Sequence, residues 1–96
     1  DLDAPCLYMA LTKARAMVNT GIKNTEEIVQ EMGKIVSPCK SGMIDYISVV
    51  DPETLESVSK VRSGDVALLA VRIGKTRLID NVILMLLMAL SWFRLC

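Results

Sequence analysis

Apolar residues recur at helical spacing in the first fifth of the chain. Four of them follow one another at intervals of four, three and four residues: Leu7, Leu11, Ala14 and Val18. These intervals place the four side chains on one face of a helix that we expect at about residues 5–19. Asp3 is positioned to cap its start, Pro5 fits a first turn, and Gly21 is placed to end it in a left-handed conformation.

A second helical pattern follows after a few residues. Asn24 and, three residues later, Glu27 resemble a capping box at its start. The apolar stripe that follows consists of Ile28, Met32, Ile35 and Val36. Pro38 ends the pattern, because the residue before a proline is driven out of the helical conformation. The short connection predicts that the two helices form an antiparallel hairpin.

The period then changes to that of strands. Residues 43–50 are rich in β-branched side chains, and residues 66–73 form a nearly continuous apolar run that indicates a central strand covered on both faces. Gly74 and Lys75 fit a two-residue hairpin loop, after which residues 76–82 return antiparallel. We therefore expect an α+β fold, with an antiparallel helix hairpin packed on a small mixed or antiparallel sheet of about three strands.

Within the first predicted strand, simple alternation assigns the side chains to two faces. One face is expected to hold Asp45, Ile47 and Val49; the other, Ile44, Tyr46, Ser48 and Val50. The next residues, 51–54, read as a turn, and so do residues 63–65, because proline, glycine and aspartate favour turn conformations.

The last part of the chain is unusually apolar. Residues 82–93 carry no charge, yet a helix that spans a bilayer needs about 20 residues. We expect a strand or a buried helix here rather than a membrane anchor. The acidic and proline-containing start does not read as a signal peptide either.

Composition narrows the possible chemistry. Eleven basic and eleven acidic residues give a net charge of zero, which argues against a nucleic-acid binder held by a positive field. The chain has no histidine, so it lacks both the most frequent general base and the most frequent metal ligand. Cys6, Cys39 and Cys96 are odd in number and show no zinc spacing, so we expect ordinary thiols in a reducing, cytoplasmic compartment.

Two groups of polar residues have structural explanations beside functional ones. Gly74, Lys75 and Thr76 look like the end of a phosphate-binding loop, but Leu69 stands where that loop needs its first glycine, which favours a hairpin turn. The carboxylates nearest the strands could form an acid–base pair only if two of them converge, and turn roles explain Asp51 and Asp65. These carboxylates are Asp45, Asp51, Glu53 and Asp65.

Basic residues gather in the second half of the chain, where few aromatic side chains accompany them. They are Lys60, Arg62, Arg72, Lys75 and Arg77. Without aromatic stacking partners they do not predict a site for single-stranded nucleic acid. Arg77 and Asp80 lie on opposite faces of their strand and cannot pair with each other, so residues 77–81 are either an ordinary half-exposed strand or a docking surface.

Several segments together resemble the C-terminal domain of the pantoate–β-alanine ligase family. They read A-P-C-L-Y at 4–8, I-D-Y-I at 44–47, V-D-P-E-T-L at 50–55 and A-L-L-A-V-R-I-G-K-T-R-L-I-D-N at 67–81. The resemblance covers about residues 2–81, and the tail from about Val82 departs from it. We therefore divide the chain into a lid-type domain at 1–81 and a hydrophobic tail at 82–96.

The resemblance implies a lid domain of an ATP- and Mg²⁺-dependent enzyme that joins pantoate to β-alanine through a pantoyl adenylate. It also implies a Rossmann-type N-terminal domain as partner, a homodimer and a cytoplasmic location. The family's catalytic residues belong to that N-terminal domain, so no catalytic or metal-binding residue maps onto this chain, and no residue can be assigned to ATP. We expect the chain to be inactive alone, with no tightly bound cofactor.

The alternative comes from another class of protein. Unpaired strand edges and an apolar tail favour self-association. The chain could therefore be a non-catalytic interaction module or a degenerate fragment.

Overall fold

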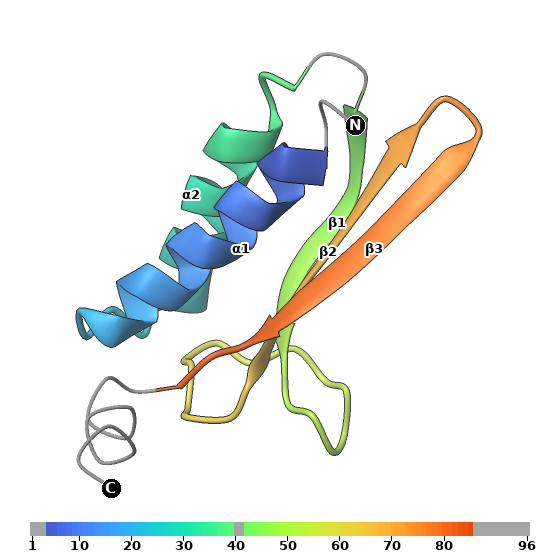
Figure 1. Ribbon diagram of the computed structural model, residues 1–96. Helices are drawn as coiled ribbons and strands as arrows, with labels where there is room; N and C mark the ends of the chain where they lie inside the picture. The colour runs from blue at the N-terminus through green and yellow to red at the C-terminus, as the bar shows by residue number, and fades with distance from the viewer. Residues whose placement is uncertain (1–3, 40–41, 86–96) are drawn as a thin grey trace, which may run out of the picture.

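Among the residues that the structure describes, two helices come first and three strands follow. The computed structural model describes residues 4–39 and 42–85. Helix α1 spans Ala4–Asn19 and helix α2 spans Thr25–Val36. Strands β1 (Gly42–Val50), β2 (Val66–Ile73) and β3 (Thr76–Ile83) form one antiparallel sheet in the order β1-β2-β3. The predicted α+β fold, a helix hairpin on three strands, is confirmed (Figure 1).

Helix α1 buries the predicted stripe. Leu7, Leu11, Ala14 and Val18 are all buried. Gly21 has a φ of 101°, and the N–H of Ile22 donates to the carbonyl of Met17 at 3.0 Å. This is the left-handed helix end that glycine permits, and it turns the chain toward α2. The proposed cap, Asp3, lies outside the described residues.

Helix α2 begins at the predicted cap. The side-chain oxygen of Asn24 accepts a hydrogen bond from the N–H of Glu27 at 2.9 Å. That bond satisfies an N–H group that the first turn of a helix leaves without a partner. Ile28, Met32 and Val36 are buried, and α2 lies antiparallel beside α1.

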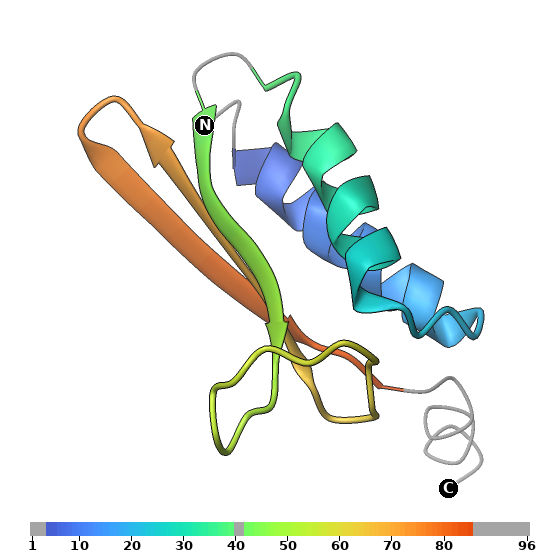
Figure 2. The same ribbon diagram turned by 180° about the vertical axis from the view of Figure 1, so that it is seen from behind.

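The helices cover only one face of the sheet (Figures 1 and 2). Ala67, Leu69 and Val71 of β2 point into the core between sheet and helices. The opposite face, which we call the open face, carries no helix among the described residues. The central position of β2 is confirmed, whereas the prediction that both of its faces are covered is wrong: Arg72 is exposed and Leu68 is only half-buried.

Strand β1 contains a bulge at Asp45. Ile44 pairs with Val71 and Tyr46 pairs with Ala70, so Asp45 is an extra residue that has no partner residue on β2. A bulge of this kind changes which face the following side chains occupy. The predicted faces are therefore wrong before Tyr46: the Asp45 carboxylate lies on the open face, and Ile44 is opposite the core residue Val71.

The fold continues past the boundary predicted after Asn81. Val82 and Ile83 complete β3, and Leu84 is fully buried in the core. The backbone N–H of Leu84 donates to the carbonyl of Asp65 at 2.8 Å, and its carbonyl accepts from the N–H of Gly64 at 2.7 Å. The first part of the predicted tail thus belongs to the domain, whereas residues 86–96 lie outside the described structure.

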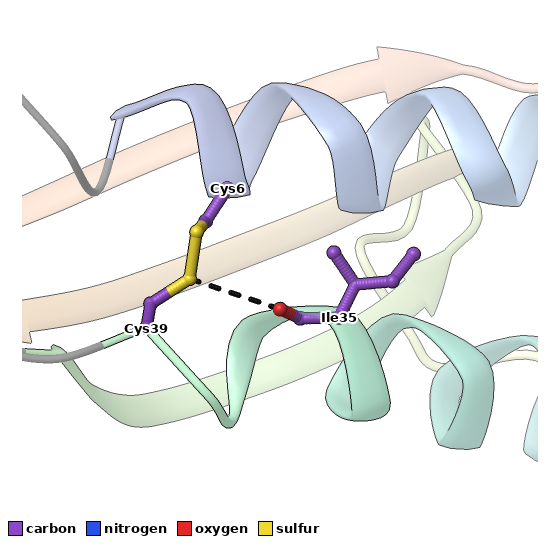
Figure 3. Close-up of a disulfide and its surroundings, with 3 residues drawn as sticks. All are labelled: Cys6, Ile35 and Cys39. Atoms are coloured by element: carbon purple, nitrogen blue, oxygen red, sulfur yellow. Dashed lines mark hydrogen bonds between the residues drawn. A yellow bond between two sulfur atoms is a disulfide. The ribbon is translucent and has the colours of Figure 1, made fainter.

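A disulfide joins the two helices at one end, which corrects the prediction of ordinary thiols. Cys6 in the first turn of α1 is bonded to Cys39, just beyond α2, with Cα atoms 6.7 Å apart (Figure 3). The Sγ atom of Cys39 also lies 3.7 Å from the carbonyl oxygen of Ile35. Sequence spacing missed this pair because the helix hairpin brings together residues that are 33 positions apart. Cys96 lies outside the described residues.

Candidate functional site

A charged cluster occupies the open face near the β2–β3 hairpin. We call Asp45, Tyr46, Arg72 and Arg77 the arginine cluster. The bulge in β1 turns the Asp45 carboxylate to this face, where its Oδ2 atom lies 2.8 Å from Nε of Arg77 and 3.8 Å from a terminal nitrogen of Arg72. The guanidinium of Arg77 also lies 5.7 Å from the centre of the Tyr46 ring.

The arginine cluster has one carboxylate for two guanidinium groups. Arg72 and Arg77 are directly opposite each other on β2 and β3, where like charges repel. Asp45 offsets this repulsion, but only Arg77 forms a hydrogen bond with it. Arg72 is half-exposed and keeps most of its donors available, so the cluster can receive a further acidic or anionic group.

A second cluster of polar residues surrounds a hollow at the other end of the sheet. An open hollow of about 310 Å³ is lined by Asp51, Pro52, Glu53, Arg62, Ser63, Gly64 and Asp65. Arg62 bridges two of these residues, with a terminal nitrogen 2.7 Å from Oδ2 of Asp51 and Nε 3.8 Å from Oδ2 of Asp65. The Arg62 guanidinium therefore links two carboxylates from separate turns and offsets one of their two negative charges.

The turn roles predicted for Asp51 and Asp65 are confirmed. Asp51 accepts hydrogen bonds from the N–H groups of Glu53 and Thr54 at 2.7 and 3.1 Å. The buried carboxylate of Asp65 accepts from the N–H of Arg62 at 2.8 Å. The N–H of Glu53, with help from that of Thr54 and from the Arg62 guanidinium, holds the pKa of Asp51 below its usual value.

The four candidate carboxylates do not meet as one acid–base pair. Asp45 belongs to the arginine cluster, whereas Asp51, Glu53 and Asp65 border the hollow. In the hollow, Asp51 and Asp65 both contact the guanidinium of Arg62 and accept backbone hydrogen bonds, so they have structural roles rather than the separate acid and base roles of a catalytic pair. Among the residues that the structure describes, no three acidic or cysteine side chains are grouped to hold a metal ion.

The phosphate-loop-like string is a turn between strands. Ile73 pairs with Thr76, so Gly74 and Lys75 are the two loop residues, and Gly74 has a φ of 60°. The predicted hairpin is confirmed. Strand β3 follows directly, so these residues do not open the helix that a phosphate-binding loop requires.

The family model that describes pantoate-β-alanine ligase matches residues 2–83. The chain belongs to this family. Its arginine cluster and its hollow are therefore features of a pantoate–β-alanine ligase domain, and the resemblance seen in the sequence is confirmed. The arginine cluster was not foreseen in the sequence, because only the bulge at Asp45 brings its three charges together.

Relatives share both the sequence and the fold of this ligase domain. The chain is 40% identical over 82 residues to pantothenate synthetase from Herpetosiphon aurantiacus, covering 84% of the chain and 30% of the relative. The corresponding protein of Thermosipho melanesiensis is 43% identical over 82 residues, covering 84% and 29%. A crystal structure of pantothenate synthetase from Thermus thermophilus is similar, with a TM-score of 0.78 and 30% identity, covering 85% of this chain and 29% of that one.

The chain thus spans about three tenths of the length of these ligase relatives, in their C-terminal region. In the described residues, no helix is both long and apolar enough to cross a membrane.

Proposed function

We propose that this chain is the C-terminal lid part of a ligase that condenses pantoate with β-alanine to pantothenate, using ATP and Mg²⁺ and passing through a pantoyl adenylate. The observation that carries the proposal is the match of 82 residues to the C-terminal region of proteins named pantothenate synthetase. The similar fold of the Thermus thermophilus enzyme supports it. The partner we propose is a Rossmann-type N-terminal half, in a cytoplasmic homodimer.

The chemistry of the two polar sites agrees with a lid rather than a catalytic centre. The hollow presents three carboxylates and one guanidinium, a donor set that repels a triphosphate. The lining of the hollow therefore disfavours the phosphates of ATP. A lid domain works by excluding water from the reacting groups and by holding bound substrates in place.

The proposal is tested with a fusion protein. The N-terminal seven tenths of the Herpetosiphon aurantiacus relative would be joined to residues 2–96 of this chain in place of its own matched region. We expect the fusion to form AMP from ATP, pantoate and β-alanine, and the 96-residue chain alone to form none. AMP formation by the chain alone, or a folded but inactive fusion, would contradict the proposal.

A self-associating interaction module is the second candidate, and the exposed apolar residues of the open face favour it. Ile79 and Ile83 on β3 are 57% and 56% exposed. Sedimentation of the chain with and without residues 86–96 separates the two functions. A monomer in both forms would count against the interaction module, whereas concentration-dependent dimers of the chain would support it.

A further inference from the structure

The open face exposes several large apolar side chains next to one another. Met43, Tyr46 and Ile79 are 72%, 37% and 57% exposed, and they lie in neighbouring rows across the three strands. Ala70 is fully buried between Tyr46 and Ile79 in the same row. Contiguous exposed apolar groups around charged residues are typical of a contact surface.

The exposed groups are concentrated at the hairpin end of this face. At the other end of β1, Val50 is buried, and the segment after β1 folds back on it through the bridge between Val50 and Ser57. Ile83, at that end of the edge strand β3, is the exposed exception. The arginine cluster and Met43 thus mark the half of the open face that no described segment covers.

The start of α1 lies at this same end. The disulfide ties Cys6, in the first turn of α1, to Cys39, three residues before β1 begins at Gly42. Gly42 in turn pairs with Ile73, next to the β2–β3 hairpin loop. In the relatives, the larger part of the protein precedes the matched region, so it joins the domain beside the hairpin end of the sheet.

We infer that the hairpin half of the open face (Met43, Tyr46, Arg72, Arg77 and Ile79) is the surface that docks on the N-terminal half of the same ligase. The inference rests on the proposed function and adds the location of the interdomain contact. The charges define the partner surface: the cluster has two guanidinium groups for one carboxylate, so the facing surface is apolar and carries an acidic group.

Two methionines and two tyrosines provide matched reporters for a test by hydroxyl-radical footprinting. Met43 and Tyr46 lie on the open face, whereas Met9 and Tyr8 are exposed on α1. We expect oxidation of Met43 and Tyr46 to be about fivefold slower in the fusion protein than in the 96-residue chain, because an interface core excludes water. Oxidation of Met9 and Tyr8 should change by less than about twofold.

Protection of Met9 and Tyr8 instead, or of neither pair, would overturn the inference. So would protection of Met43 in the chain alone that grows with concentration, since a second copy would then occupy the face. AMP formation is measured on the same sample. If the fusion is active but Met43 and Tyr46 are not protected, only the docking surface is contradicted. If they are protected but the fusion is inactive, only the proposed function is contradicted.

A pair of variants with equal exposure gives a second measurement. Ile79 on the open face is 57% exposed and Met9 on α1 is 56% exposed. We expect Ile79→Glu to lower kcat/KM of the fusion by about tenfold, whereas Met9→Glu leaves it within about twofold, because a buried charge weakens an interface centre. Thermal unfolding of both variants in the 96-residue chain checks that each still folds. Equal effects of the two variants would contradict the inference.

Discussion

Gly33 sits inside α2, where it faces β1 without needing to be glycine. A Cβ atom added there would lie 3.9 Å from Cδ1 of Ile47, which is an ordinary van der Waals contact. Glycine in the middle of a helix costs conformational entropy that alanine does not. The packing between helix and sheet therefore tolerates a methyl group at this position.

We predict that Gly33→Ala raises the free energy of unfolding by about 0.5–1 kcal/mol, as measured by urea denaturation. Gly21→Ala is the contrasting variant, because Gly21 has a φ of 101° with open space around it. That change should destabilise the protein by about 1 kcal/mol, since only the backbone conformation is strained. Equal effects of the two alanines would show that packing around Gly33 is tighter than described.

Asp51 predicts a pH-dependent contribution to stability. Hydrogen bonds from the backbone of Glu53 and Thr54, together with Arg62, lower its pKa in the folded state below the usual 3.8. The folded state therefore favours the charged carboxylate, and the resulting stability is fully present above pH 3.8 and is lost as pH falls through the folded pKa.

The variant Asp51→Asn keeps a side-chain oxygen for the turn but loses the charge. We expect it to be less stable than the unchanged chain at neutral pH, with the difference disappearing at the acid end of a series of urea titrations. Glu53→Gln is the control on the same turn, since no hydrogen bond or ion pair of its carboxylate is found in the described structure. A difference between Asp51→Asn and the unchanged chain that persists at low pH would refute the charge effect.

The helix hairpin is an element closed into a ring by the disulfide between Cys6 and Cys39. A cross-link of this span restricts the unfolded chain, so its loss should lower stability. We predict that the double variant Cys6→Ser, Cys39→Ser unfolds with a free energy lower by about 3 kcal/mol. Reductant should lower the stability of the unchanged chain by a similar amount and leave the double variant unaffected. A response of the double variant to reductant would point to another cause.

The sequence correctly predicted the elements that depend on residues close together along the chain. The stripe from Leu7 to Val18, the cap at Asn24 and the hairpin at Gly74 all depend on residues a few positions apart, and all are present. The bulge at Asp45 and the disulfide depend on how distant segments align. Alternation alone cannot reveal one extra residue in a strand, so the arginine cluster could not be predicted either.

At the scale of the whole molecule, Leu84 closes the core near the end of the described chain. Its side chain is fully buried, and its backbone is bonded to Gly64 and Asp65 in the loop before β2. It thus links the end of β3 to the start of β2. The sequence predicted a boundary after Asn81, because an apolar run reads the same whether it continues a strand or begins a tail, whereas the family match extends to residue 83.

We predict that Leu84→Ala lowers the free energy of unfolding by about 2–5 kcal/mol, because it leaves a cavity in the core. The neighbouring Ile83 is 56% exposed, so Ile83→Ala should cost less than about 1.5 kcal/mol. Chemical denaturation followed by circular dichroism measures both. If the two variants are equally stable, Leu84 does not close the core as described.

Because of the bulge, β1 can lose one residue without losing its pairing with β2, which a strand without a bulge cannot. Ile44 and Tyr46 already face consecutive residues of β2, Val71 and Ala70, so removing Asp45 would leave an uninterrupted ladder with every other partner unchanged. Deleting a residue of β1 that is not next to Asp45 would shift the register and reverse the faces of its neighbours. We therefore expect the fold to tolerate loss of one residue at the bulge, where removal of Asp45 would leave Arg72 and Arg77 without their shared carboxylate.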